Sequence, residues 1–440
     1  MKSIIAFPIR ILLWGAGSIL LAIAFFVDDP YFASLREHLS TYILGSAVLG
    51  VGLAAFVGGK AQSNRWSNRA LLALWCAVPL SLGVVKASAL LTADKVLSAP
   101  DDLARAYGRH FIVGYWRVEE VEPLVSKGLV GGIFVTRHNI SRGAESLRAE
   151  IEHLQELRRM ADLPPLIVTT DQEGGLVSHL SPPLAARPPL AELATLAAPE
   201  RKGKAQAQGE ALGAELAALG VTLDFAPVVD LHSDIDGGRL DFNSFIQQRA
   251  ISSDPTVVTE IATAFAHGLE AQGVEATLKH FPGLGRVPED THHFRAHLKV
   301  TPEELAGTDW RPFRDTLAGT NSALMVGHVV VDALDPERPA SQSKPVVDGL
   351  LRGKWRFDGL IVTDDLNMGA VFRHGLCSGV IASLNAGVDL LLVSYDGRQY
   401  YPIMRCVLDA AAQGAIDQAA LERSAQRLRS IDGHGLSKSQ

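Results

Sequence analysis

The chain has 440 residues, which is long enough for one large barrel-type domain together with a smaller segment. Its formal net charge is −7, from 41 Lys and Arg against 48 Asp and Glu, and this argues against a nucleic-acid partner, which calls for a basic surface. Hydrophobic residues make up 47% of the chain and the mean hydropathy is +0.15, slightly high for a soluble enzyme, so membrane segments are expected.

Three apolar runs of nearly bilayer length lie at the N-terminus. Ile11–Val27 and Thr41–Gly59 carry no charge, and Leu71–Leu91 is interrupted only by Pro79 and by Lys86, whose stem can reach toward the membrane surface. A secretory signal peptide accounts for the first run alone, and a buried helical hairpin is a further alternative. We interpret residues 1–95 as a helical anchor with about three membrane spans.

The charges of the short connecting loops predict the orientation of this anchor. Basic residues precede the first run and separate the second from the third, whereas the first loop is acidic on balance: Lys2, Arg10, Lys60, Arg65 and Arg69, against Asp28, Asp29, Arg36 and Glu37. The positive-inside rule then places the N-terminus in the cytoplasm. Three crossings put the chain beyond about Ala93 on the periplasmic or other extracytoplasmic side of the inner membrane. The third span is the weakest, and its loss would reverse this orientation.

Three cysteines are too few for a disulfide framework. Cys76 lies in an apolar run, and Cys377 and Cys406 lie in helical patterns, so buried free thiols are expected at all three positions. The sequence contains no pair of cysteines at metal-ligand spacing, and no metal site is predicted.

From Asp101 onward, short apolar runs alternate with amphipathic stretches. The expected strands are His110–Tyr115, Gly132–Thr136, Leu166–Thr170, Val221–Val229, Val274–Leu278, Ala323–Val330, Leu360–Thr363 and Val388–Val393, and the clearest helices are Glu145–Met160, Ala205–Leu219 and Thr256–Gln272. Continuous apolar strands separated by helices predict a parallel sheet covered on both faces. Eight such units fit an α/β fold, a (β/α)₈ TIM-type barrel over residues 101–435. A doubly wound sheet is the alternative, weakened because no G-x-G-x-x-G follows the first strand.

Polar residues gather where these strands end. They are Asp171-Gln172-Glu173-Gly174-Gly175, Asp230, Arg239, Arg249, Lys279, His280, His328, Asp364 and Asp365. Chemistry in α/β barrels is placed at this end of the strands, so the carboxylates, imidazoles and arginines predict a site with acid/base and nucleophilic capacity.

The most informative stretch is KHFPGLGRVPEDTHH, from Lys279 to His293. It closes a buried strand with two basic groups, continues through a Pro- and Gly-rich loop, and presents Asp290, His292 and His293. The Asp290-x-His292 spacing suits a carboxylate that orients an imidazole and raises its basicity. The plainer alternative is a surface turn that happens to contain histidines.

Five separate motifs resemble glycoside hydrolase family 3, and within it the β-N-acetylhexosaminidase branch. They are TDQEGG at 170–175, DFAPVVD at 224–230, KHFPGLG…DTHH at 279–293, HVVVDALDPERPAS at 328–341 and FDGLIVTDDLNMGA at 357–370. The resemblance covers about Asp101 to Asp396. It implies a single-barrel retaining glycosidase without the second domain of many family members, and with no cofactor.

The resemblance also implies roles for individual residues. Asp364 corresponds to the nucleophile, with Asp365 as a structural carboxylate, and His292 paired with Asp290 corresponds to the general acid/base, His293 being its rival. For the sugar, the resemblance points to Asp171, Lys279, His280 and Arg249, with Arg239 as a less well-aligned competitor for Arg249. His179 lies where family members usually have an arginine, and we place it among the substrate-binding residues.

Three further departures affect the expected pocket. Leu176 replaces an arginine, Leu284 replaces a histidine, and Thr363 precedes the nucleophile where serine is common. The predicted function is removal of terminal β-linked N-acetylglucosamine from peptidoglycan fragments or related glycans, with water or phosphate as the acceptor. The alternatives are a β-glucosidase or β-xylosidase of the same fold, and a catalytically weak, membrane-tethered glycan-binding protein.

Overall fold

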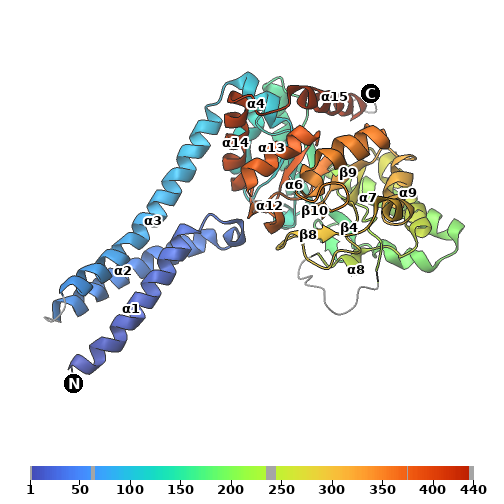
Figure 1. Cartoon of the computed structure of the whole chain (residues 1–440). Coiled ribbons are helices and arrows are strands. Elements are labelled where there is room, and N and C mark those ends of the chain that lie inside the picture. The colour runs from blue at the N-terminus through green and yellow to red at the C-terminus, as the bar shows by residue number, and fades with distance from the viewer. Residues whose placement is uncertain (1, 61–64, 234–243, 374, 436–440) are drawn as a thin grey trace. The chain divides into compact units, whose positions relative to one another are not determined.

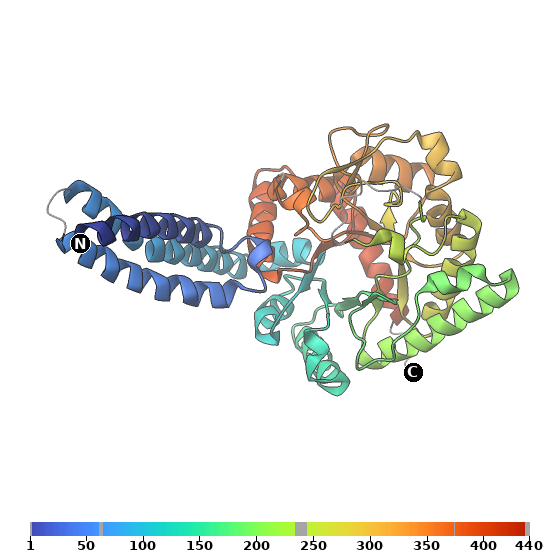
Figure 2. The same ribbon diagram turned by 90° about the horizontal axis from the view of Figure 1, so that it is seen from below.

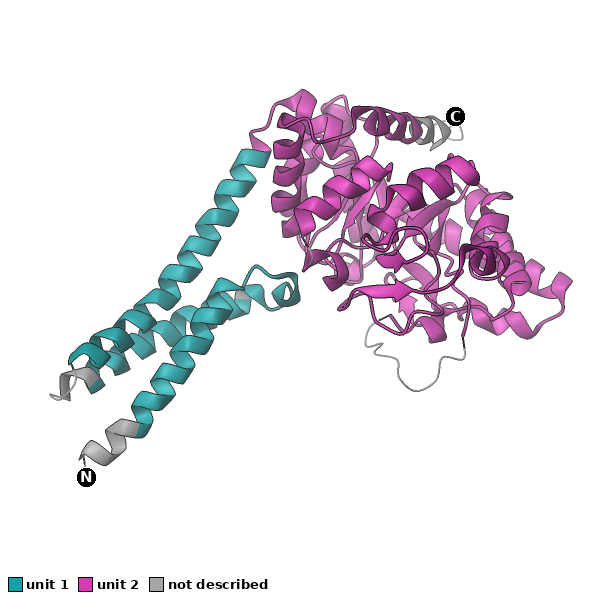
Figure 3. Ribbon diagram, viewed as in Figure 1, with its two compact units in different colours: residues 1–96 teal, residues 97–440 magenta. Residues whose placement is uncertain are grey.

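The computed structural model describes residues 2–60, 65–233, 244–373 and 375–435. The chain divides into two compact units, Met1–Val96 and Leu97–Gln440 (Figure 3). We describe each unit by itself.

The first unit consists of three long helices, α1 (Lys2–Phe25), α2 (Arg36–Lys60) and α3 (Arg65–Leu97), with a short 3₁₀ turn at Pro30–Phe32. Each contains a window that is long and apolar enough to cross a membrane, with mean hydropathies of 1.8, 1.8 and 1.9. These helices contain the three predicted apolar runs, except that the first run extends two residues beyond the end of α1, to Val27. Many of their large apolar side chains, Val48 and Leu49 among them, point away from the unit and are exposed.

Small residues allow these helices to approach one another. The indole of Trp75 on α3 lies so close to Gly50 on α2 that a single added carbon at Gly50 would collide with the ring. Gly17 on α1 leaves similar room for Leu74. Small residues at close crossings are the usual device of helices that pack in lipid, where the hydrophobic effect does not drive association.

The second unit is built on eight parallel strands: β1 (Phe111–Gly114), β2 (Gly132–Phe134), β3 (Ile167–Thr170), β6 (Leu223–Asp224), β7 (Glu275–Phe281), β9 (Ala323–Val326), β11 (Ile361–Thr363) and β12 (Leu391–Val393). Their order in the sheet is β11-β9-β7-β6-β3-β2-β1-β12, so each strand pairs with its predecessor in this set and β12 returns to β1. A parallel bridge between Val362 and Leu390 links the two outer strands. The sheet is therefore a nearly closed barrel, unlike the doubly wound alternative.

Helices connect these strands and lie around the sheet (Figure 1 and Figure 2). They are α4 (Asp101–Gly108), α5 (Val118–Lys127), α6 (Ala144–Met160), α7 (Ala198–Leu219), α8 (Ile246–Arg249), α9 (Pro255–Ala271), α10 (Pro302–Gly307), α11 (Trp310–Leu317), a π-helix at Pro345–Lys354, α12 (Gly369–Phe372), α13 (Leu376–Ala386), α14 (Tyr400–Ala412) and α15 (Gln418–Gly435). The strands are buried on both faces, which explains their continuous apolar sequences.

Two small sheets stand outside the barrel order. β4 (Gln172–Gly174) and β5 (Val177–Ser178) form an antiparallel hairpin directly after β3, and β8 (Ala296–Leu298) pairs with β10 (Val329–Val331). The predicted strand Ala323–Val330 is thus divided between β9 and β10. The predicted strand Val221–Val229 shortens to β6, because Pro227 has no N–H to donate and only an isolated bridge at Val228 follows.

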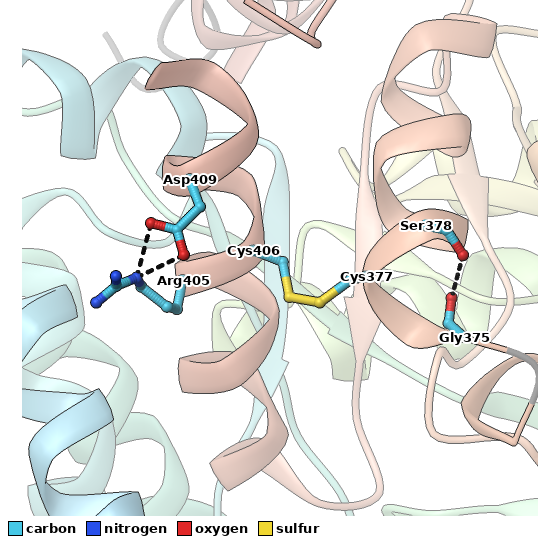
Figure 4. Close-up of a disulfide and its surroundings, with 6 residues drawn as sticks. All are labelled: Gly375, Cys377, Ser378, Arg405, Cys406 and Asp409. Carbon is cyan, nitrogen blue, oxygen red and sulfur yellow. Dashed lines mark hydrogen bonds and ion pairs between the residues drawn. A yellow bond between two sulfur atoms is a disulfide. The ribbon is translucent and has the colours of Figure 1, made fainter. Parts of the chain in front are cut away.

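The cysteine prediction is wrong in part. Cys377 in α13 and Cys406 in α14 form a disulfide, with their Cα atoms 5.5 Å apart (Figure 4). Neither is fully buried, and Cys76, which is free, is exposed. A helical pattern indicates which face of each helix is apolar, but not which residues of two neighbouring helices lie opposite each other. The pairing depends on how the two helices pack in the tertiary structure, and the sequence pattern could not predict it.

Candidate active site

The polar residues predicted at the strand ends are brought together at one end of the barrel. Asp171 directly follows β3, Lys279 and His280 lie in the last part of β7, and Asp364 directly follows β11. Because all eight strands are parallel, their C-terminal ends share one face of the barrel. The loops that leave this face supply the remaining groups.

Two basic and two acidic side chains form a largely buried network at this end of the barrel. Lys279 forms ion pairs with Asp171 and Glu173, the latter at 2.6 Å. Arg249 donates two hydrogen bonds to the same Glu173 carboxylate, from Nε to Oε2 at 3.0 Å and from Nη2 to Oε1 at 2.5 Å. Burial alone would raise the pKa of Glu173, but the charges of Arg249 and Lys279 outweigh it and hold the pKa well below its ordinary value. Burial likewise opposes the charge of Lys279, yet Asp171 and Glu173 raise its pKa. Glu173, Lys279 and Arg249 are therefore held in their charged forms.

His280 is held in one orientation by Asp230. The Asp230 Oδ2 atom accepts hydrogen bonds from Nδ1 of His280 at 2.7 Å and from its backbone N–H at 3.0 Å, while Oδ1 accepts from the backbone N–H of Leu284 at 2.7 Å. Because both oxygens of Asp230 accept from backbone N–H groups, we assign the proton of His280 to Nδ1, and Nε2 is directed toward Arg249. Arg249 Nη2 lies 3.4 Å from that Nε2.

Asp364 is held at the end of β11 in an ionised state. Its backbone N–H donates to the carbonyl of Val326 at 3.0 Å, and its Oδ1 accepts from the backbone N–H of Asp365 at 2.9 Å. Burial would raise the pKa of this carboxyl, but the neighbouring imidazoles of His280, His328 and His292 outweigh it, so the pKa is lowered. An ionised, partly accessible carboxylate has the properties of a nucleophile.

His292 and Asp290 form the predicted pair. Asp290 is buried. Its Oδ1 accepts hydrogen bonds from Nδ1 of His292 at 2.7 Å and from the backbone N–H of His292 at 2.9 Å. The imidazole itself is 40% exposed. Burial would lower the pKa of His292, but the hydrogen bond to Asp290 and the charges of Asp364 and Asp290 outweigh it and raise the pKa. Asp290 thus favours the protonated imidazole and fixes Nε2 as the nitrogen that faces outward.

The loop that carries His292 is joined to the chain that follows Asp364. The backbone N–H of Gly369 donates to the carbonyl of His292 at 2.8 Å, and that of Ala370 donates to the carbonyl of Thr291 at 3.4 Å. These two contacts bring the imidazole and the Asp364 carboxylate to the same part of the barrel face.

Asp365 and His328 hold the loops of the same region in place through hydrogen bonds. The carboxylate of Asp365 accepts from the backbone N–H groups of Asn367, Ser394 and Tyr395 and from the hydroxyl of Ser394, at 2.7–3.1 Å. It therefore ties the loop after β11 to the loop after β12. His328 Nδ1 lies 2.8 Å from the hydroxyl of Ser341 and its Nε2 lies 3.1 Å from the carbonyl of Asp365, and burial lowers its pKa.

His179, Leu176 and Leu284, which differ from the residues usual in the family motifs, lie in three different environments. His179 packs edge-on against Phe134 with ring centroids 5.8 Å apart, and burial lowers its pKa. Its Nδ1 has no hydrogen-bond partner among the described residues. Leu176 is exposed at the β4–β5 hairpin and lines a small hollow with Glu173 and Arg249, whereas Leu284 is buried.

Three carboxyl groups of this region were given no individual role in the sequence analysis, and Asp224 was not among the strand-end polar residues. Glu173 joins Lys279 to Arg249, Asp230 orients His280, and Asp224 accepts from the backbone N–H of Gln172 at 2.9 Å, while burial raises its pKa to about 8. Glu173 and Asp230 were visible in the sequence as polar residues at strand ends, but their partners are distant along the chain. Arg239 lies outside the described residues. Among those described, no group of three or more His, Cys, Asp or Glu could hold a metal ion.

Comparisons with known proteins agree on one family. Residues 110–431 match the family model described as the glycosyl hydrolase family 3 N-terminal domain. A β-hexosaminidase of Xylella fastidiosa is 37% identical over 282 residues, which is 63% of this chain and 79% of that protein. One of Xanthomonas campestris is 35% identical over 270 residues, covering 60% and 77% of the two chains.

Solved structures give the same result. A β-N-acetylhexosaminidase from Beutenbergia cavernae aligns with a TM-score of 0.67 and 31% identity, covering 75% of this chain and 98% of the other. A family 3 β-N-acetylglucosaminidase from Paenibacillus sp. aligns with a TM-score of 0.68 and 30% identity, covering 75% of this chain and 62% of that longer one.

Proposed function

Since the chain belongs to glycosyl hydrolase family 3 and is a glycosidase, we propose that it removes terminal β-linked N-acetylglucosamine from peptidoglycan fragments or related glycans. The observation that carries the proposal is the ionised Asp364 beside the His292–Asp290 pair. The names of the related β-hexosaminidases support the choice of sugar.

In this proposal the reaction proceeds in two steps with retention of configuration. A carboxylate oxygen of Asp364 attacks the anomeric carbon, while protonated His292 gives the proton on Nε2 to the departing glycosidic oxygen. The neutral imidazole then takes a proton from water, whose oxygen attacks the anomeric carbon and releases the ester oxygen of Asp364. The raised pKa of His292 supports its first role, and Asp290 stabilises the imidazolium in both steps.

The same proposal assigns the terminal sugar to the charged network. Asp171 and Lys279 offer an acceptor and a donor for its hydroxyl groups, and Arg249 and His280 offer further donors and acceptors. His179, neutral because burial lowers its pKa, completes the set with a ring nitrogen that has no partner among the described residues.

The first prediction concerns specificity. The full chain in detergent should release 4-nitrophenol from the N-acetyl-β-D-glucosaminide with a kcat/KM at least about 100-fold above that for the matched glucoside and xyloside. Comparable rates on the glucoside or xyloside would favour the alternative glycosidase reading. Binding of N-acetylglucosamine without turnover of any of the three would favour the glycan-binding protein.

We further propose that the first unit is a three-span anchor and that the second is a TIM-type barrel on the extracytoplasmic side. The three apolar helices and the basic loops support the anchor and its direction. The Cys377–Cys406 disulfide supports the side, because disulfides persist in oxidising compartments such as the bacterial periplasm.

The second prediction tests that side. We expect the full chain, purified from membranes without reductant and unfolded in an alkylating reagent, to label at Cys76 alone. After reduction all three cysteines should label. The Cys377→Ser variant is the matched control, since it should free Cys406 for labelling without reductant. Labelling of Cys377 and Cys406 in the unreduced protein would contradict an extracytoplasmic barrel.

A further inference from the structure

Three ring-bearing side chains lie on the rim of the barrel where three neighbouring strands end. Tyr395 follows β12, Trp116 follows β1 and His138 follows β2, and β1 lies between the other two strands in the sheet. Tyr395 is 54% exposed and Trp116 43% exposed. Single exposed aromatic residues are ordinary, but Trp116 and Tyr395 lie with the exposed imidazole of His138 on adjoining loops at the functional end of the barrel, and this grouping needs an explanation.

Two of these rings are held together. The ring centroids of Trp116 and His138 are 4.4 Å apart with the planes inclined by 55°. The loops beneath them are joined by Asn139, whose Nδ2 donates to the carbonyl of Tyr115 at 3.1 Å and whose Oδ1 accepts from the backbone N–H of Thr136 at 2.8 Å. The indole is therefore presented from supported backbone.

The third ring connects this surface to the candidate active site. The backbone N–H of Tyr395 donates to the Asp365 carboxylate at 2.9 Å, and Asp365 is the residue after Asp364. The register of β1 against β12 pairs Val113 with Val393, so the residues that follow, including Trp116 and Tyr395, leave the sheet side by side. The segments that carry Asp364, Tyr395, Trp116 and His138 thus follow four neighbouring strands of the barrel, β11, β12, β1 and β2.

We propose that Tyr395, Trp116 and His138, here named the aromatic rim, form an acceptor subsite that binds the second and third sugars of a β-linked glycan chain. The proposal rests on the proposed function, because the terminal sugar must lie at Asp364 for the rest of the chain to leave along the rim. The C–H faces of a β-linked pyranose are apolar and slightly positive, and they stack on the electron-rich faces of aromatic rings.

The charges around the aromatic rim favour a neutral glycan over a membrane surface. Arg117 pairs with Glu120 at 3.3 Å, Arg398 lies 3.8 Å from the same carboxylate, and Arg142 pairs with Glu150 at 3.0 Å, so both signs of charge flank the rings. A surface that docks on anionic lipid would instead carry an excess of basic residues. The substrate class inferred is therefore an oligosaccharide of at least three β-linked sugars.

The test compares a long substrate with one that has no aglycone ring, using the full chain in detergent. Trp116→Ala and Tyr395→Ala should each lower kcat/KM for β-1,4-linked N-acetylglucosamine tetrasaccharide by about tenfold, mainly through KM. Turnover of N-acetyl-β-D-glucosaminyl fluoride should change less than about twofold, because this substrate fills only the terminal-sugar site. Trp116→Phe keeps a stacking face and should recover most of the loss.

Met160→Ala is the matched control, since Met160 is exposed at the end of α6 that leads into β3, on the opposite end of the barrel. It should leave both substrates unchanged. Equal losses on the fluoride and the tetrasaccharide, or no loss on either, would overturn the subsite. The subsite would also be overturned if Trp116→Ala hydrolysed both substrates normally but bound less well to vesicles of anionic lipid. Failure of the wild-type chain to hydrolyse the fluoride would instead overturn the proposed function, which keeps the two failures distinct.

Discussion

The Asp364→Asn variant is expected to lose at least about 10⁴-fold in kcat for the 4-nitrophenyl N-acetylglucosaminide. The amide has nearly the same shape as the carboxylate and still accepts from the backbone N–H of Asp365, so the fold of the loop should be retained. It cannot form the glycosyl ester, because a neutral amide oxygen is a poor nucleophile. Steady-state kinetics with a thermal melt on the same sample measures both effects.

Asp365→Asn is the matched control for this change. Asp365 lies one residue away, but its carboxylate is used in hydrogen bonds to Asn367, Ser394 and Tyr395. We expect this variant to lower the melting temperature and to lose far less kcat than Asp364→Asn. Rapid acid quenching of the wild-type enzyme, followed by fragmentation of the labelled peptide in a mass spectrometer, should place the glycosyl group on Asp364 and not on Asp365. A label on Asp365, or full activity of Asp364→Asn, would refute the assignment.

The second large effect is expected from His292→Ala, with a loss of about 10²–10⁴-fold on substrates whose leaving group needs a proton. The loss should be greatest for N-acetylglucosamine disaccharide and smaller for the 4-nitrophenyl glycoside, because nitrophenolate leaves without protonation. Equal losses on the two substrates would show that His292 does not act as the general acid. The rival His293→Ala, which leaves the Asp290–His292 hydrogen bond in place, is the control.

The pH profile carries the same test. The first step needs His292 protonated and Asp364 ionised, so kcat/KM should fall as the pH rises through the pKa of His292 and as it falls through the pKa of Asp364. Since the pKa of His292 is raised and that of Asp364 lowered, the active window should extend beyond the ordinary values on both sides. Asp290→Asn removes the negative charge that favours the imidazolium, and should move the basic limb to lower pH.

Much of the barrel could be predicted because its strands are buried on both faces. Such strands appear as continuous apolar runs, and each of the eight predicted runs overlaps a strand of the barrel. The errors have local causes: Pro227 shortens β6, and Ala323–Val330 turns out of the barrel sheet to pair with β8 instead. β7 extends through Lys279 and His280, since their polar side chains have partners inside the barrel in Asp171 and Asp230.

The candidate site could be predicted only where its members are close in sequence. Asp290 and His292 form a pair that two-residue spacing is sufficient to indicate. Arg249 and Glu173 are 76 residues apart in sequence, and the two cysteines of the disulfide are 29 residues apart, so neither pair follows from a local pattern. Asp224 was missed for a related reason, because its raised pKa comes from burial among other carboxylates rather than from its neighbours in sequence.

The buried network of Asp171, Glu173, Lys279 and Arg249 has a consequence for how substrate arrives. Each basic side chain in it lies against a carboxyl group, and all four are strong hydrogen-bonding groups at close range. An uncharged sugar has no net charge on which a long-range field could act, so these groups bind it only after it has reached the barrel mouth. Capture then depends on diffusion and on contact with the barrel mouth, and its rate should be nearly independent of ionic strength.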